Sequence, residues 1–249
     1  IDRAKAQHSA SVNRLSDGLK TLGNVASAGK SLLEGVKNAV DIAASGSAFL
    51  MKHPYTLHIV TEARNAAELK VNVATLKEIG ERTGKSLANS VPKVMRARPF
   101  SPVRGMLGLN GERWVPIHAV FPLGDAGRVV DANEAYFAER AAEMKEHGIV
   151  YTVMTMTVGN EFFIEPAFYW MDEITPLHER SLGTDVVKPW RDRAANPQAR
   201  EAVAKLRRGT QELYASLGGV SWQVARDYPF KEILSEGTWS LLCDVKKAV

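Results

Sequence analysis

Two polar side chains in apolar, strand-like segments are the residues of this chain best suited to acid–base chemistry. Glu165 lies between Ile164 and Pro166, where a carboxylate is costly unless it is paired or protonated. Burial would raise its pKa and make it a base or a hydrogen-bond partner for a substrate. An outward-facing position on an edge strand, which the adjacent proline favours, is the alternative.

His118 is the second candidate, because it lies between Ile117 and Ala119 on a predicted strand and next but one to Pro116. A buried histidine needs hydrogen-bond partners, so His118 is either a satisfied core residue or part of a pocket wall. The sequence leaves both interpretations open. We take Glu165 and His118 as the candidate catalytic residues.

A third group follows the double glycine Gly218-Gly219 in the segment VSWQVARDYPF. Trp222, Arg226 and Tyr228 are almost evenly spaced and would share one face of an extended segment. Arg226 either holds an anion with its guanidinium or pairs with a neighbouring carboxylate. The predicted substrate-binding residues are Trp222, Gln223, Arg226, Tyr228 and Tyr169.

These residues must be positioned by a unit that runs from Trp114 to Trp170. The sequence predicts a strand over Trp114–Phe121, and then a helix capped by Asp131 and Glu134 that ends at His147 before Gly148. A second strand over Val150–Val158 and a third over Phe162–Trp170 flank the tight-turn signal Gly159-Asn160 and form a hairpin.

A similar order of elements precedes this unit. Tyr55–Glu62 alternates like a strand, and Asn65 caps a helix whose core stripe is Leu69, Val73 and Leu76. Two β-α-β-like units of ferredoxin-like type predict an α+β fold: an antiparallel sheet with helices on one face, plus helical N- and C-terminal segments.

Three regions are predicted along the chain: a helical segment over 1–50, an α+β substrate domain over 51–180, and a C-terminal helical segment over 181–249. The last region has Asn196-Pro197 as a helix start and a final helix over Thr238–Val249. Residues 86–112 form a long loop with a short helix and the basic residues Lys93, Arg96, Arg98 and Arg104.

The composition, with 249 residues, 24% charged residues and a net charge of +4, is that of an ordinary globular protein. No segment interleaves basic and aromatic residues as a nucleic-acid surface does. The single cysteine, Cys243, excludes an intramolecular disulfide and is expected to be buried. No apolar run is long enough to span a membrane.

The cytoplasm is therefore the expected compartment. Two helices are predicted within residues 1–50. The second carries Lys30 and Lys37 beside an apolar stripe and either docks onto the protein or lies on a membrane surface. The chain begins without a methionine and inside a helical pattern, so we expect a longer polypeptide.

Two glycine patterns fail as nucleotide-binding motifs. Gly23–Ser31 reads GNVASAGKS, but five residues separate its glycines where a phosphate loop needs four, and no strand precedes it. Gly105, Gly108 and Gly111 are not followed by a helix and are turn glycines.

From about Tyr55 to Val249 the chain resembles the C-terminal part of FAD-linked oxidases of the vanillyl-alcohol oxidase and p-cresol methylhydroxylase superfamily. The resemblance rests on WVPIHAVFPLGDA, EHGIVYTVMTMTVGNEFFIEPAFYW, LYASLGG and SLLCDVKKAV. It implies a cap domain that covers the flavin ring and a small-molecule substrate and is completed by the C-terminal segment. It also implies a separate N-terminal FAD-binding domain, whose residues are not in this sequence, and it is compatible with a homodimer.

Differences from the family refine this expectation. Phenol-oxidising members carry a Tyr-Arg pair where this chain has Trp222-Gln223. Members with covalent flavin use a His or Tyr on the cap hairpin, and Glu161–Glu165 contains neither, so the resemblance implies noncovalent FAD. The metal-binding hydroxy-acid branch uses two histidines; His118 could match the second, but Gly111 stands near the first, so no metal is expected. A metal-dependent 2-hydroxy-acid dehydrogenase cap and a non-catalytic α+β binding module of ferredoxin-like type are the alternative functions. Substrate and electron acceptor are not specified.

Overall fold

The computed structural model describes residues 55, 57–86, 107–108, 110–223 and 228–248. The chain divides into two units, Asp2–Pro102 and Val103–Val249. The predicted helices of residues 1–50 and the basic loop residues Lys93, Arg96, Arg98 and Arg104 lie outside the described residues.

In the first unit, the described residues form one helix, α4 (Ala66–Glu81). Asn65 caps it as predicted, because its side-chain oxygen accepts a hydrogen bond from the backbone N–H of Glu68 at 2.9 Å. The predicted core stripe is wrong, since Leu69 is 40% exposed, Val73 is 51% exposed and no residue of α4 is buried.

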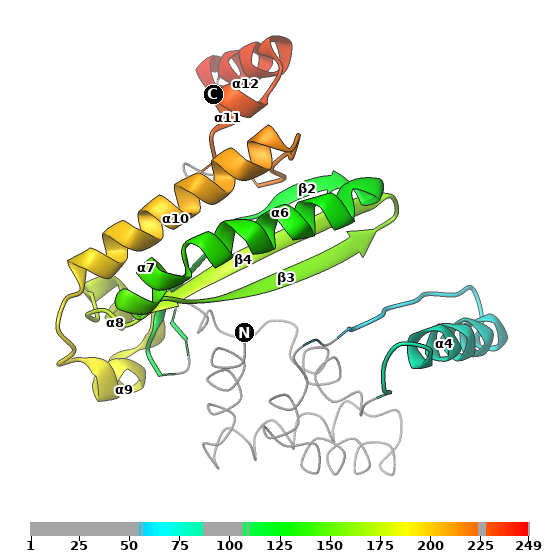
Figure 1. Ribbon diagram of the computed structural model, residues 1–249, viewed down its shortest axis with the longest axis horizontal. Coiled ribbons are helices and arrows are strands. Elements are labelled where there is room, and N and C mark those ends of the chain that lie inside the picture. The colour runs from blue at the N-terminus through cyan, green and yellow to red at the C-terminus, as the bar shows by residue number, and fades with distance from the viewer. Residues whose placement is uncertain (1–54, 56, 87–106, 109, 224–227, 249) are drawn as a thin grey trace. The chain divides into compact units, whose positions relative to one another are not determined.

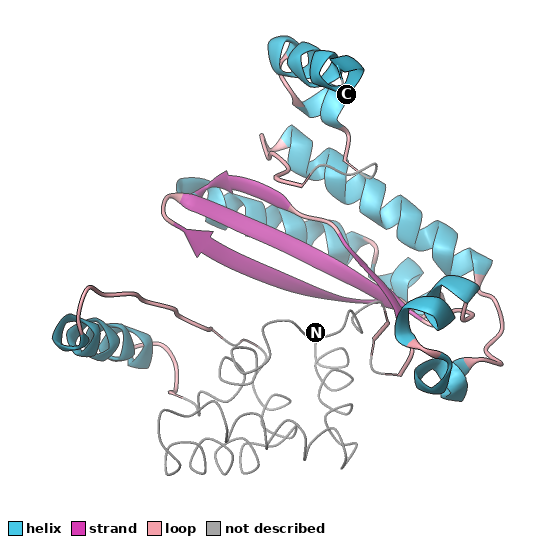
Figure 2. Ribbon diagram, turned by 180° about the vertical axis from the view of Figure 1, so that it is seen from behind, coloured by secondary structure: helices cyan, strands magenta, loops and turns pink. Residues whose placement is uncertain are grey.

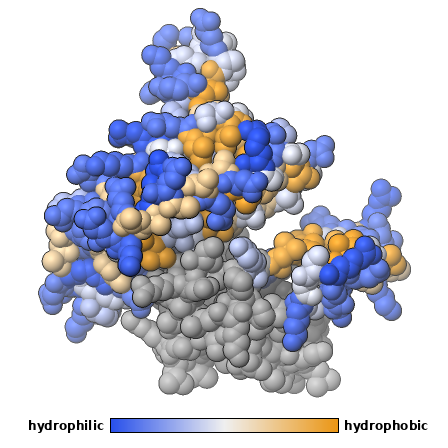
Figure 3. Space-filling model, viewed as in Figure 1, coloured by the Kyte–Doolittle hydropathy of each residue, from blue (hydrophilic) through white to orange (hydrophobic). Residues whose placement is uncertain are grey.

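The predicted strand over Tyr55–Glu62 is also wrong, since its described residues are assigned to no strand. An alternating pattern of β-branched residues favours an extended backbone, but a β-strand forms only where a neighbouring strand supplies backbone hydrogen bonds. Apolar side chains therefore stand exposed along this segment and the adjoining side of α4, as Figure 3 shows; they include Leu57, Ile59 and Val60.

The second unit is built on an antiparallel sheet whose central strand is β4 (Glu161–Trp170). One side of β4 pairs with β3 (Val150–Val158), and the other side pairs with β1 (Arg113–Pro116) and then β2 (Ala119–Pro122). Figure 1 shows the long β3–β4 hairpin. The predicted α+β class and the predicted hairpin are confirmed.

β1 and β2 behave as two halves of one strand. Pro116 is opposite Ala167 in β1 and Ala119 is opposite Ile164 in β2, so the register is the same on both sides of the break. Between them the Ile117 N–H still donates to the Pro166 carbonyl at 3.0 Å. The predicted strand over Trp114–Phe121 is thus present but interrupted.

The helices of this unit include the predicted ones, with different bounds, and several short ones that were not predicted; the helix predicted to end at His147 is divided in two at Arg140. The helices of this unit are the short 3₁₀ helix η2 (Leu123–Asp125), α6 (Ala126–Glu139), α7 (Ala141–Glu146), α8 (Pro176–Leu182), α9 (Thr184–Val187), η3 (Lys188–Trp190), α10 (Pro197–Ser216), α11 (Phe230–Ile233) and α12 (Glu236–Ala248).

The helix predicted to begin at Asp131 begins five residues earlier, because η2 leads directly from β2 into α6 and leaves Asp131 exposed inside the helix. Asn196 caps α10 as predicted, accepting from the Ala199 N–H at 3.1 Å. Cys243 in α12 is half-buried, so its predicted burial is wrong.

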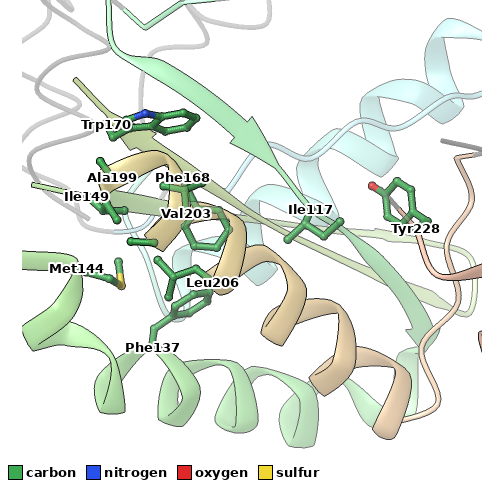
Figure 4. Packing of buried hydrophobic residues seen from close by; sticks show 11 residues of the cluster. Ile117, Phe137, Met144, Ile149, Phe168, Trp170, Ala199, Val203, Leu206 and Tyr228 are labelled. Carbon is green, nitrogen blue, oxygen red and sulfur yellow. The ribbon is translucent and has the colours of Figure 1, made fainter. Parts of the chain in front are cut away.

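Helices cover one face of the sheet. Side chains from β2, β4, α6 and α10 form the core, and Figure 4 shows Phe137 of α6, Phe168 of β4 and Leu206 of α10 packed together. Each large apolar side chain removed from water in this way contributes about 1.5–3 kcal/mol. Figure 2 shows the strands from their other side, in front of α6.

A buried carboxylate joins the end of β4 to the start of α10. Asp172 is fully buried and accepts hydrogen bonds from Arg200, from the Trp170 indole and from the Asn196 backbone N–H. Arg113 of β1 lies 3.5 Å away. Burial opposes the charge, but these hydrogen bonds outweigh it and lower the pKa of Asp172 to about 2.

We expect Asp172→Asn to lower the free energy of unfolding by roughly 1.5–3 kcal/mol in urea titrations at pH 7, because it removes the buried charge that accepts hydrogen bonds from Arg200 and lies 3.5 Å from partly buried Arg113. The wild-type contribution should be complete above about pH 4 and lost as the pH falls towards 2, since the folded pKa is the lower one. Glu201→Gln, which removes an exposed ion pair with Lys205, is the matched control and should change little. Equal effects of the two substitutions would contradict this account.

Candidate active site

The common register of β1 and β2 places His118 opposite Glu165 across the interrupted strand. Glu165 in turn pairs with Met154 of β3, so the three residues form one row across the sheet. Residues directly opposite one another in an antiparallel ladder project to the same face. Ile117 and Ile164, which alternate with this row, lie in the helix-covered core. The row therefore lies on the other face, which we call the His118 face.

His118 is enclosed by aromatic rings. It is 2% exposed, its ring stacks on Phe163 with the centroids 5.3 Å apart, and Trp222 meets it edge-on at 5.8 Å. The Tyr228 hydroxyl lies 2.5 Å from Nδ1. Burial disfavours the charged imidazole and lowers the pKa of His118 to about 4, so the ring is neutral at pH 7.

The two ring nitrogens of His118 have different surroundings. Nδ1 has the Tyr228 hydroxyl at 2.5 Å and a Glu165 carboxylate oxygen at 3.9 Å. Nε2 is buried and has no hydrogen-bond partner among the described residues. Leaving a buried polar atom unsatisfied costs about 1–3 kcal/mol, so Nε2 is a position where a ligand atom or water would be stabilised.

Glu165 lies on the central strand of the sheet rather than on an edge, because β4 is paired on both sides. The edge-strand explanation for this carboxylate is therefore wrong. Its side chain is only 20% exposed, and burial raises its pKa above the ordinary value. Glu165 thus accepts a proton more readily than an exposed glutamate does.

The structure brings four of the predicted site residues together: His118, Glu165, Trp222 and Tyr228. Gln223 is exposed, and Arg226 lies outside the described residues. The extended segment expected to align the tryptophan and the tyrosine is instead bent at Trp222 and Gln223, yet both rings reach His118.

Tyr169 shares the face of Glu165 but lies four residues further along β4, where it stacks on Trp114 with the centroids 6.3 Å apart. Phe163, which was not among the predicted site residues, contacts both the His118 ring and Trp222. Its position two residues before Glu165 on the same strand was the signal that could have identified it.

A small hollow lies beside His118 between β2 and the C-terminal part of α10. Its lining includes Gln211, Tyr214, Ser221 and Tyr228. The enclosed part has room for about one water molecule, so it does not accommodate a substrate.

In the part of the chain that the structure describes, no group of three or more His, Cys, Asp or Glu is placed to hold a metal ion. The described helices include none with the length and apolar character needed to cross a membrane. Comparison with protein-family models, curated proteins and solved structures finds no match to this chain.

Protonation of His118 should cost stability in mild acid. The folded pKa of about 4 is below the ordinary 6.5, so the unfolded chain binds this proton more readily. The stability contributed by the neutral ring is complete above about pH 6.5 and is lost as the pH falls towards 4. We expect His118→Gln to show a shallower loss of stability over that range in urea titrations.

Two other groups require a control. Glu165, with its raised pKa, acts in the opposite direction, and buried His178, with its lowered pKa, acts in the same direction as His118. Comparison between variants therefore isolates the His118 contribution, with His58→Gln at an exposed position as the control. If both variants follow the wild-type pH dependence, His118 titrates normally and the description of its environment is wrong.

Proposed function

We propose that this chain is the substrate-cap part of an FAD-dependent oxidoreductase that oxidises an alcohol, a phenol or a hydroxy acid. The observation that carries the proposal is a buried, neutral His118 whose Nε2 has no hydrogen-bond partner among the described residues, beside Glu165 on the sheet face opposite the helices. The sequence resemblance described above supports the same class of enzyme.

The residues of the His118 face suit a planar ring system and a small substrate. Trp222, which packs on buried Phe163, is 60% exposed, and Met154 and Met156 are 51% and 38% exposed on the neighbouring strand. Such a combination of apolar surface with few polar groups is typical of small-molecule sites. The nucleotide portion of FAD would be held by the separate FAD-binding domain that the resemblance implies. When bound, the flavin would supply the hydride acceptor.

His118 would remove the proton that a substrate hydroxyl loses as the carbon gives up its hydride. The substrate O–H bond breaks, a new N–H bond forms at Nε2, and the alcohol becomes a carbonyl. His118 is unprotonated above about pH 4 and so has a lone pair available at neutral pH, although the burial that lowers its pKa also makes it a weaker base than an exposed histidine. The Glu165 carboxylate, 3.9 Å from Nδ1, would stabilise the resulting imidazolium, and it is itself the second candidate base.

Flavin content is the first test of the proposal. The complete protein, purified without added cofactor, should be yellow and release FAD on denaturation, since the resemblance implies noncovalent attachment. A colourless protein that does not bind added FAD would instead favour a non-catalytic α+β binding module.

Substitutions in the flavin-loaded protein test the residue roles. We expect His118→Ala to lower kcat by roughly 10²–10⁴-fold, the usual contribution of a positioned general base. Glu165→Gln should also lower kcat, while Glu161→Gln, which changes an exposed carboxylate on the same strand and face, should leave it unchanged. Normal turnover in both site variants would exclude the proposed roles.

A further inference from the structure

Tyr228 has a different place in the site from the one that its sequence position predicted. Its hydroxyl is engaged by the histidine, because the phenol oxygen lies 2.5 Å from Nδ1 of His118. The two rings are 4.8 Å apart. In Figure 4 Tyr228 lies at the edge of the core cluster, beyond Ile117.

We propose that Tyr228 is a positioning residue that, together with Glu165, keeps the proton of His118 on Nδ1 and leaves the lone pair of Nε2 for the substrate. The catalytic consequence of this inference rests on the proposed function. The position of the proton on Nδ1 does not, because it is a property of His118 and its neighbours in this chain.

The two nitrogens of a neutral histidine cannot both carry the proton, and the neighbours of each nitrogen decide between them. Nδ1 faces two oxygen atoms, the Tyr228 hydroxyl and the Glu165 carboxylate. A proton on Nδ1 can be donated to the hydroxyl oxygen and is attracted by the carboxylate. A proton on Nε2 would have no acceptor among the described residues.

The ring orientation is fixed at the same time. Phe163 supports one side of the imidazole and Trp222 meets it at a steep angle of 73°. These contacts restrict tilting of the ring, and the Tyr228 hydrogen bond distinguishes Nδ1 from Nε2. If the imidazole rotated by 180° about its Cβ–Cγ bond, each nitrogen would take the place of a ring carbon. Nδ1 would then lose its hydrogen bond to Tyr228.

The three residues of this arrangement come from distant parts of the chain. His118 comes from the break between β1 and β2, Glu165 from β4, and Tyr228 from the segment that follows α10, 110 residues after the histidine. Tyr228 thus acts on the substrate through His118. This role differs from direct substrate binding, which would affect KM first.

The test is the ¹⁵N NMR signature of His118 in the chain itself, assigned with His118→Gln. The wild type should show a protonated Nδ1 and an unprotonated Nε2 at pH 7. Tyr228→Phe removes only the hydroxyl and should replace this single tautomer by a mixture. The matched control is Tyr136→Phe, which removes a hydroxyl bonded to the Leu206 carbonyl and should leave the His118 signals unchanged.

A proton on Nε2 in the wild type, or an unchanged tautomer in Tyr228→Phe, would overturn the inference whether or not the protein binds flavin. In the flavin-loaded protein, Tyr228→Phe should lower kcat by roughly 10- to 100-fold with little change in KM, as expected when a catalytic group loses its orientation. A rise in KM with kcat unchanged would instead make Tyr228 a substrate-binding residue. Because the NMR measurement needs no cofactor, failure of the inference and failure of the proposed function are distinguishable.

Discussion

The register of β4 against its neighbours is the constraint on which the candidate site depends. β1 and β2 keep one register along the same side of β4, so the break at His118 neither inserts nor removes a residue. A slip of one residue would send His118 into the helix-covered core and bring Ile117 to the other face. The pairing of His118 with Glu165 is therefore a consequence of backbone hydrogen bonding as much as of side-chain chemistry.

Asp172 and His118 are both buried polar side chains beside the sheet, but their hydrogen-bonding surroundings differ. Asp172 is surrounded by donors, which keep it ionised and tie β4 to α10. Within the described part of the chain, His118 has partners on Nδ1 but none on Nε2, and its neighbour Glu165 has a raised pKa. The hydrogen bonds to Asp172 stabilise the fold, whereas Nε2 of His118 is the position at which we propose that a ligand binds.

Local signals predicted much of this unit. Alternation and the Gly159-Asn160 turn gave the β3–β4 hairpin, and Asn196-Pro197 gave the start of α10. Long-range features were not predictable: the strand expected over Tyr55–Glu62 depends on a partner that alternation does not specify, and the link from Tyr228 to His118 joins residues 110 positions apart. Spacing grouped the tyrosine with the site but could not distinguish contact with a substrate from contact with the histidine.

The most direct test of the central claim is a crystal structure of the complete protein with FAD and a bound substrate analogue. This account predicts that the flavin ring and the analogue lie against the His118 face, with a polar atom of the analogue within hydrogen-bond distance of Nε2. A structure in which Nε2 is satisfied by the protein itself, or in which the cofactor lies on another surface, would contradict it.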